Sequence, residues 1–466
     1  MMVGPFRRHT ASGGAQRHLS LEGTVNDQRE IRGWVMYDWA NSAFSTTVVT
    51  ALLGPYILAL AESSNTPLTL FGVTIEPAAI FPIAASLSVA LQIFFLPLLG
   101  TIADYTYLKK RMMMAFAYTG AAATILLFFV GDDFDLIGTN GAIVFGSLML
   151  IVANLCFGAA VVFYNSFLPD IATPDLRDAV SSQGFAMGYL GGGLLLLVNL
   201  VMLTVMDDTA LAVRLSLASA GIWWLLFTYL YPQQRLRQRA PARELPEGAN
   251  FLTHGTREIV NTLKNLYRDY PETLRFLVAY LVYNDGIQTV IIVSTAFAAD
   301  EMGVATDMLL LLVLLIQFMA FFGALLFGRL ARRIGAKRAI LISLVIWSGC
   351  VIFAYAFLYE LWQLFALGFF VALVLGGSQA LSRSLFSQMI PRDHEAEYFG
   401  FYEISERGTS WLGPLAFGVA VQATGSQRVA IVTLIGFFVV GLLLLSRVNV
   451  RQAMLDAGND PAGVVF

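Results

Sequence analysis

The chain has 466 residues, of which 57% are hydrophobic and 13% are charged, and its formal net charge is −3. This composition excludes a large water-soluble enzyme, and the placement of Lys and Arg between long apolar runs excludes a nucleic-acid surface. Because hydrocarbon contains no water to satisfy backbone polar groups, such runs are expected to cross a membrane as helices.

The first 33 residues contain arginines among small and polar residues and lack an apolar core of signal-peptide length. We interpret residues 1–33 as a cytoplasmic N-terminal tail. Twelve apolar segments follow, each long enough to cross about 30 Å of hydrocarbon as a helix. The predicted spans are 34–61, 79–103, 112–130, 142–164, 182–206, 210–231, 273–298, 307–330, 339–358, 361–383, 398–423 and 429–446.

Basic residues mark alternate connections between these spans. They lie at Lys109 to Arg111, at Arg177, within 232–272, between Arg329 and Arg338, and at Arg392, with Arg428 as an exception on the other side. The positive-inside rule then predicts a multi-pass protein of the cell membrane with both termini in the cytoplasm.

The connection from 232 to 272 is the longest polar segment inside the chain, and a surface helix is predicted near 257–267. It separates a first six-helix bundle, 34–231, from a second, 273–446, which a cytoplasmic tail, 447–466, follows. The expected fold class is an all-α membrane protein with twelve transmembrane helices in two pseudo-symmetric six-helix bundles.

Weak internal repeats also predict two related halves. Corresponding positions occur in the same order in both halves: Gly100 with Gly328, Pro169 with Pro391, and Gly188 with Gly413. Two parallel repeats would enclose a cleft at the membrane midplane that opens alternately to either side. A glycine stripe in the fifth span fits a sliding interface, although ordinary close helix packing needs the same small residues. The stripe comprises Gly184, Gly188, Gly192 and Gly193.

Ionisable groups at the bilayer centre cost about 2.5 to 3.5 kcal/mol each, so they normally face a cavity, a partner or a pathway. Asp285 lies near the middle of the seventh span beside Asn284, with Gln288 one turn later. We interpret these three as substrate-binding or coupling residues that face a solvated cleft. The alternative is a buried hydrogen bond between helices.

Asp38 and Asn41 share one face at the start of the first predicted span. They are candidates for a gating or substrate role, although a carboxylate in a first helical turn is also favoured by the helix macrodipole. Trp34 and Trp39 beside them are interpreted as interfacial anchors.

Charged residues also lie in the tenth and eleventh spans. Glu403 and Arg407 are four residues apart, which favours a structural ion pair and leaves Glu406 to pair across helices or to carry a proton. Arg383, with Gln379 one turn earlier, could hold a substrate carboxylate through two hydrogen bonds, or it could extend to the interface.

The loop after the second span resembles the signature of the major facilitator superfamily, in which a Gly and an acidic residue precede a basic cluster. The gating-loop residues that this resemblance implies are Gly100, Asp104, Gly328, Arg332 and Arg333. Arg332 stands where the second copy would have its acidic residue, which argues against an Asp–Arg charge pair and leaves Asp104 to cap a neighbouring helix N-terminus. The glycine stripe is similar to the exporter motif of the superfamily, which implies efflux.

Four longer strings are more specific: Gly33–Phe44, Tyr164–Pro169, Asn284–Gly286 and Gly377–Ser384. Together they resemble the bacterial members of the "unknown major facilitator" family, which is related to the fungal vacuolar effluxers of autophagy. The resemblance runs from residue 33 to residue 446. It implies the major facilitator fold and the release of amino acids or similar solutes.

We therefore expect a secondary active transporter that exports small polar metabolites, with protons as the candidate coupling ion. A non-transporting receptor, or a lipid or drug exporter on the same scaffold, is the alternative. An enzyme is not expected, because no phosphate-binding loop, metalloprotease motif or serine-hydrolase motif occurs and all four histidines lie outside the spans. No catalytic residue, cofactor, metal or nucleic-acid partner is predicted, and the expected partners are the solute and the lipid bilayer.

Overall fold

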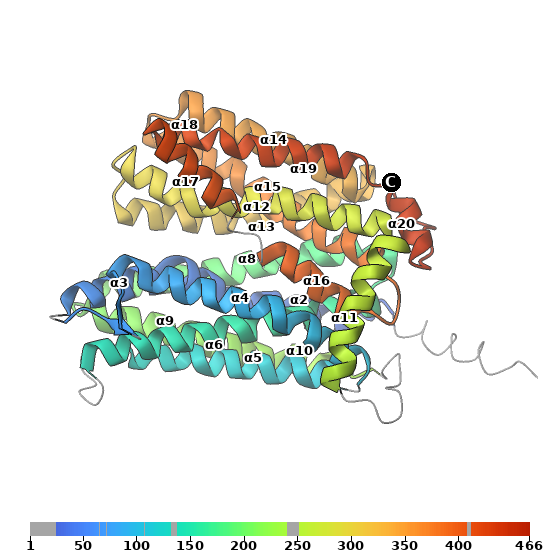
Figure 1. Ribbon diagram of the computed structural model, residues 1–466, viewed down its shortest axis with the longest axis horizontal. Coiled ribbons are helices and arrows are strands. Elements are labelled where there is room, and N and C mark those ends of the chain that lie inside the picture. The colour runs from blue at the N-terminus through green and yellow to red at the C-terminus, as the bar shows by residue number, and fades with distance from the viewer. Residues whose placement is uncertain are drawn as a thin grey trace, which may run out of the picture.

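A computed structural model describes residues 25–64, 66–70, 72–106, 108–131, 138–239, 251–407 and 412–466. Its long helices run side by side along one axis and form an N-terminal half and a C-terminal half (Figure 1). Among the described residues, eleven helices are long and apolar enough to cross a membrane. The chain is therefore an all-α, multi-pass membrane protein.

Within the described part of the chain, the N-terminal half contains six long helical segments. They are α2 (Gln28–Ala43) continuing through η1 (Phe44–Leu52) into α3 (Leu53–Ser63), then α4 (Pro77–Asp104), α5 (Lys109–Leu126), α6 (Gly138–Ser166), α8 (Pro174–Val205) and α9 (Thr209–Leu230). Short elements complete it: the hairpin strands β1 (Thr69–Leu70) and β2 (Val73–Thr74), η2 (Leu127–Phe129), α7 (Leu168–Ile171) and α10 (Pro232–Arg235).

The helix α11 (Phe251–Arg268) connects the two halves. The C-terminal half then comprises α12 (Pro271–Asp300), α13 (Thr306–Ile334), α14 (Ala336–Phe357), α15 (Leu361–Gln388), α16 (Glu395–Arg407), α17 (Leu412–Thr424), α18 (Gln427–Ile431), α19 (Thr433–Ser446) and α20 (Val450–Asp456). Several long helices begin with Pro, whose fixed φ angle and missing N–H suit a first helical turn.

The basic connections of the sequence lie at the end of the molecule that carries α10, α11 and α20, and this end is called the basic end below (Figure 1). The helix α11 runs across the bundle axis at this end. It extends beyond the predicted surface helix, 257–267, at its N-terminal side. The predicted N-terminal tail lies outside the described residues up to residue 24.

The first helix begins at Gln28 rather than near residue 34, as the sequence predicted. The Asp27 side chain accepts a hydrogen bond from the Arg29 backbone N–H, and buried Glu30 forms an ion pair with Arg239 at 2.9 Å. The local cap and the long-range ion pair stabilise a polar first turn that hydropathy alone cannot detect. As a result, Asp38 lies almost three turns inside the helix, about 15 Å from its start at a rise of 1.5 Å per residue, and not in its first turn.

The predicted eleventh span, 398–423, corresponds to two helices, α16 and α17, with residues 408–411 between them outside the described part of the chain. This pair completes the twelve-span arrangement together with the eleven long apolar helices.

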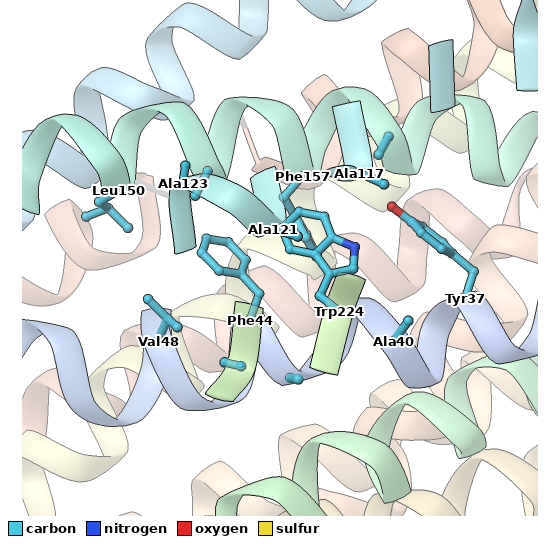
Figure 2. Close-up of a cluster of buried hydrophobic side chains, with 14 of the residues drawn as sticks. Tyr37, Ala40, Phe44, Val48, Ala117, Ala121, Ala123, Leu150, Phe157 and Trp224 are labelled. Atoms are coloured by element: carbon cyan, nitrogen blue, oxygen red, sulfur yellow. The ribbon is translucent and has the colours of Figure 1, made fainter. Parts of the chain in front are cut away.

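Aromatic packing builds the core of the N-terminal half. Phe44 of the first helix lies between Trp224 of α9 and Phe157 of α6, with ring centroids 5.5 Å from each (Figure 2). Small residues on α5, Ala117 and Ala121, are fully buried at the same cluster. Alternating large rings with alanines lets four helices approach closely around one core.

Arg428, the exception to the charge pattern, has a structural role at the opposite end. Its guanidinium donates hydrogen bonds of 3.3, 3.1 and 2.7 Å to the carbonyls of Ala354, Tyr355 and Leu358. These carbonyls lie at the C-terminal end of α14, where helices leave backbone acceptors without intrahelical partners. The local cap accounts for a basic residue at this position.

The two halves meet mainly through α8, which packs against α13 and α15, and through α4, which packs against α16. Two glycines from corresponding positions of the repeats make these approaches possible. A side chain at Gly100 would overlap the backbone of Ala396 on α16, and one at Gly328 would overlap Ser182 on α8. The repeat inferred from sequence thus has a structural counterpart at the interface.

The glycine stripe of α8 serves mainly close packing within the N-terminal half. Side chains at Gly188 and Gly192 would collide with Ser42 and Thr46 of the first helix. Gly193 is the one glycine of the predicted stripe whose close neighbours, among them Gln317 of α13, all belong to the other half. The alternative interpretation, ordinary tight packing, therefore describes most of the stripe.

Candidate functional site at the interface between the halves

A buried ion pair joins Asp38 of α2 to Arg383 of α15. Arg383 Nη2 lies 3.0 Å from Asp38 Oδ2, and the two residues are 3% and 9% exposed. The pair therefore connects opposite halves of the molecule. Neither charge would be stable alone in an apolar interior, because desolvating an unpaired ion is costly.

The N-terminal half satisfies the other donors of the Arg383 guanidinium. Its Nε donates to Ser181 Oγ at 2.9 Å, and Nη2 donates to the Ser181 carbonyl at 3.0 Å. Its Nη1 donates to Asn165 Oδ1 at 3.3 Å. A cation of the C-terminal half is thus held by α2, α6 and α8 of the other half.

Aromatic rings enclose the same guanidinium. The ring centroids of Phe185, Trp34 and Tyr164 lie 4.2, 4.7 and 5.3 Å from the Arg383 Cζ atom. Trp34 stacks on Tyr164 with centroids 4.4 Å apart, and the Tyr164 hydroxyl donates to Asp38 at 2.7 Å. Cation–π contacts and exclusion of water both strengthen a charge pair at such a site.

These contacts correct two interpretations made from the sequence. Trp34 is fully buried and donates from Nε1 to the Tyr164 carbonyl at 2.7 Å, so it is not an interfacial anchor. Arg383 does not extend to the interface, because its guanidinium points into the other half. From the sequence alone, both residues are expected at the membrane surface, because the predicted spans begin at Trp34 and end at Arg383.

A second charged group adjoins the pair through Asn165. The Asn165 side-chain amide donates to Glu403 Oε1 at 2.9 Å, and Arg407 Nε donates to Glu403 Oε2 at 3.1 Å. The Arg407 guanidinium lies 4.8 Å from the ring centroid of Phe157 on the N-terminal half. The predicted Glu403–Arg407 pair is present, and it also contacts the other half. Glu406 interacts with Arg407 and with Tyr280 of α12.

Further polar contacts between the halves continue along α8 and the first helix. Tyr189 of α8 donates to Gln379 of α15. Gln317 of α13 donates to Thr46 Oγ1 at 3.0 Å, within the wide-turned segment η1. Gln379, a residue selected from the sequence, thus contacts the other half, whereas Tyr189, Thr46 and Gln317 were not selected.

The basic end of the interface is closed by Asp104 at the end of α4. Its carboxylate accepts hydrogen bonds from the backbone N–H groups of Ala396 at 3.1 Å and Glu397 at 2.9 Å. These groups belong to the first turn of α16, where a helix has free N–H donors and a positive dipole end. The expected capping role of Asp104 is confirmed, and the helix that it caps lies in the other half.

Two residues at the start of α8 extend this closure. Arg177 Nη1 donates to the Ser387 carbonyl at 2.7 Å, and Asp178 Oδ1 accepts from the Ser384 hydroxyl at 2.6 Å. Both side chains are almost fully buried against α15. The halves are thus fastened together by charged and polar groups at the basic end.

The second gating loop differs from the first. Arg332 and Arg333 are exposed at the end of α13, so the position equivalent to Asp104 carries no buried acid. The closure at the basic end is therefore asymmetric, although the glycines Gly100 and Gly328 are used in the same way.

Asn284 and Asp285 lie within the C-terminal half, next to the junction of α16 and α17. The Asn284 amide donates to the Glu406 carbonyl at 2.8 Å, close to the end of α16. Asp285 is 1% exposed, and its Oδ2 atom lies beside Gly413 in the first turn of α17. The structure thus puts Asp285 in the packing of α12 against α17, and not in a solvated cleft.

The remaining predicted residues lie apart from the ion pair. Asn41 is buried beside Tyr37 in the N-terminal half, and Gln288 is partly exposed one turn after Asn284. No hydrogen bond from either side chain to Asp38 or Arg383 occurs among those described in the structure.

Sequence reasoning missed three residues that form hydrogen bonds with the ion pair: Tyr164, Asn165 and Ser181. Tyr164 and Asn165 do lie in one of the four family-like strings, and that string was the available signal. Ser181 carries no such signal, because an isolated serine in an apolar helix is common. The strings containing Trp34, Asp38, Tyr164, Asn165 and Arg383 converge at one site only in the folded chain.

Within the described residues, no group of three or more His, Cys, Asp or Glu side chains could hold a metal ion. Both cysteines, Cys156 and Cys350, are buried and free. Cys350 lines an apolar cavity of about 70 Å³ inside the C-terminal half, away from the ion pair.

Comparison with protein families gives a match over residues 26–458 to the family described as "Vacuole effluxer Atg22 like". The chain is 31% identical to the "Uncharacterized MFS-type transporter YxiO" of Bacillus subtilis, over 90% of this chain and 94% of that protein. It is 24% identical to "Autophagy-related protein 22-1" of Penicillium rubens, over 92% of this chain and 91% of that protein.

Solved structures with similar folds belong to the major facilitator superfamily or to related transporters. A bacterial homologue of the iron transporter ferroportin matches with a TM-score of 0.64 and 11% identity, over 90% of this chain and 98% of that chain. The proton:xylose symporter XylE matches with a TM-score of 0.63 and 13% identity, over 93% and 96%. At these identities the comparison concerns the fold alone, and the fold is that of the major facilitator superfamily.

Proposed function

The chain belongs to the Atg22-like family of the major facilitator superfamily, and from this premise we propose that it is a secondary active transporter that exports small polar metabolites, in particular amino acids. The family is described as vacuole effluxers, and a bacterial relative is named an MFS-type transporter. The proposed route is alternating access, in which the two halves rock about a site between them.

The observation that carries this proposal is the Asp38–Arg383 pair. A guanidinium presents a planar fork of donors that matches a carboxylate, so Arg383 is suited to the carboxylate of an amino acid. In the structure this position is taken by Asp38, an internal carboxylate. Exchange of Asp38 for a solute carboxylate would loosen the connection between the halves without leaving Arg383 unpaired, and the ammonium group of the same amino acid could pair with the displaced Asp38 carboxylate.

The same exchange supplies a link between binding and movement. A ligand shifts a conformational equilibrium only through its differential affinity for the two states. A solute that replaces Asp38 removes a bond that exists only while the halves are joined at the basic end. If the basic connections are cytoplasmic, as the positive-inside rule predicts, the state described here is closed toward the cytoplasm.

The test is a flux assay with purified protein in liposomes, using radiolabelled amino acids from a panel that covers apolar, polar and charged side chains. We expect exchange of at least one amino acid, and a decrease of tenfold or more for Arg383→Lys, which keeps the charge but loses the fork. Arg111→Lys, an exposed substitution of the same kind at the basic end, should leave flux unchanged.

The outcomes separate this proposal from its alternative. Amino acids that raise the melting temperature but never cross the membrane would identify a receptor. Transport of lipids or apolar drugs that is insensitive to Arg383→Lys would identify an exporter that does not use this site. Full amino-acid flux in Arg383→Gln would remove Arg383 from the mechanism.

A further inference from the structure

A large polar cavity lies at the basic end, apart from the Asp38–Arg383 pair. Its volume is about 490 Å³. Its walls come from the start of α14, the end of α15, the end of α19 and the chain around α20, with Asp178 of α8 at the side of the other half. None of the residues predicted from the sequence as a transport site lines this cavity.

Basic residues dominate the charge of the cavity. Lys337, Arg338, Arg447 and Arg451 line it together with Phe466, whose carboxyl group lies beside Gly335 at the start of α14, and the one acidic side chain in the lining is the carboxylate of Asp178. That carboxylate is already engaged, since it accepts from Ser384 and from Gln388 Nε2 at 2.6 and 3.3 Å. The cavity as a whole is therefore electropositive.

The lysine is fixed at the wall of the cavity. Lys337 Nζ donates to the carbonyls of Ser446 and Val448, each at 2.8 Å, and so holds the end of α19 beside the start of α14. An acidic residue that interacts with it, Glu272, is engaged by Arg275 and by the Asn449 backbone N–H. The arginines Arg338, Arg447 and Arg451 are exposed at the rim, so their donors are available to a ligand.

The backbone adds to the positive potential. Ala336, the first residue of the 22-residue helix α14, also lines the cavity. The N-terminus of a helix of this length carries a partial positive charge and free N–H donors, both of which favour anions. Three arginines, one lysine and a helix N-terminus together suit a ligand with several anionic oxygens, above all a phosphate group.

The surroundings favour a phosphate that is part of a lipid. Apolar side chains, including Leu341, Leu385 and Val450, form part of the lining. Next to the cavity, the side chains of Ile342 and Val345 on α14 and of Leu443 on α19 are exposed, and they begin the apolar surface that would face the bilayer. A headgroup in the basic cavity could therefore keep its acyl chains against this apolar strip, which a free phosphate would not use.

We propose that this cavity binds the headgroup of an anionic phospholipid. Because Asp178 and α8 belong to the N-terminal half, the cavity is complete only while the halves are joined at the basic end. A bound headgroup then favours that state, since a ligand stabilises the conformation that it binds better. The proposal does not depend on the transported solute or on the Asp38–Arg383 pair.

The test measures thermal unfolding of delipidated protein in a neutral detergent with short-chain phosphatidylglycerol, with phosphatidylcholine of the same chain length, or with inorganic phosphate. We expect the melting temperature to rise with phosphatidylglycerol only, through binding to the folded state. In the variant Arg338→Gln/Arg451→Gln, the apparent affinity for phosphatidylglycerol should fall on the order of tenfold or more, at about 1 kcal/mol per basic residue near a lipid surface.

A matched control is Arg32→Gln/Arg111→Gln, which removes the same charge from exposed positions of the N-terminal half at the basic end. The control should retain wild-type affinity, and both variants should unfold like the wild type without lipid, because all four side chains are exposed. An equal loss in the control would show a general surface-charge effect and overturn the assignment. Equal stabilisation by inorganic phosphate would assign the cavity to a free anion and overturn the lipid proposal.

Discussion

At the scale of single residues, the site is a set of buried charged side chains that stabilise one another by pairing. Removing one partner of a buried ion pair costs about 3–5 kcal/mol, because the other charge stays buried. Asp38 and Arg383 are stable in an otherwise apolar interface because each supplies the counter-charge of the other. Glu403 extends the network, since Asn165 donates to it and also accepts from Arg383.

The position of Glu403 leads to a prediction about coupling. Its carboxylate contacts both halves and is fully buried, whereas Asp285 packs within one half. Movement of the halves would change the surroundings of Glu403 more than those of Asp285. If protons are the coupling ion, Glu403→Gln should abolish accumulation driven by a pH gradient while amino-acid exchange at equilibrium persists.

The matched variant is Asp285→Asn, which also removes one buried carboxylate from the C-terminal half. It should retain pH-driven flux in liposomes, once the measured flux is corrected for the amount of folded protein. Loss of pH-driven flux in Asp285→Asn alone, with Glu403→Gln unaffected, would reverse the assignment of the proton site.

At the scale of elements, α12 packs against both α16 and α17, which precede and follow residues 408–411. Asn284 donates to a carbonyl near the end of α16, and the carboxylate of Asp285 lies at the start of α17. Adjacent polar residues of the helix α12 thus contact both α16 and α17. Polar residues within a span can therefore serve helix packing, without contacting a solute.

This packing predicts different effects for two glycines of α17. A methyl group at Gly413 would overlap the Thr289 side chain, whereas no atom lies within 4 Å of the corresponding position at Gly418. Gly413→Ala should destabilise the protein by about 1–3 kcal/mol, the usual cost of overpacking. Gly418→Ala should be neutral or stabilising, because Ala is the better helix former by about 1 kcal/mol.

Thermal unfolding in detergent measures both variants, and Thr289→Ala should restore part of the stability lost in Gly413→Ala. Equal melting temperatures for the two glycine variants would contradict the close approach of α17 to α12.

At the scale of the whole molecule, the interface is fastened at the basic end by contacts between the halves. Asp104 caps α16, Arg177 donates to the Ser387 carbonyl, and Asp178 accepts from Ser384. A transporter that works by alternating access has to break this set once in each cycle. The strength of the set then determines the population of the closed state.

Asp104 offers a way to change that population. Loss of a capping side chain costs about 0.5–2 kcal/mol, so Asp104→Ala should shift the equilibrium away from the closed basic end by a factor of about 2 to 30. Spin labels at the exposed positions Arg111 and Gln452, one in each half, report the separation by double electron–electron resonance. Labelling is selective, because both native cysteines are buried.

We expect a longer-distance population to grow in Asp104→Ala. Arg332→Gln, which changes the exposed residue at the equivalent position of the other half, should leave the distance distribution as in the wild type. Identical distributions for wild type and Asp104→Ala would mean that the capping bond does not control closure.

The sequence by itself determined the fold class, the approximate spans and the connecting segment, because hydropathy and segment length depend on the bilayer and not on neighbouring helices. It also selected Asp38, Arg383, Gln379, Asp104 and Glu403, since a charge or amide near an apolar span stands out in any context.

Only the tertiary structure decided which of these residues meet. Asp38 and Arg383 are 345 positions apart, and the sequence offered a separate local explanation for each. The same holds for Asp285, whose surroundings depend on the close approach of α17 to α12, and for Trp34, whose burial depends on an early start of α2. Pairing across helices is a property of packing, and hydropathy along one chain carries no information about which distant side chain will supply the counter-charge.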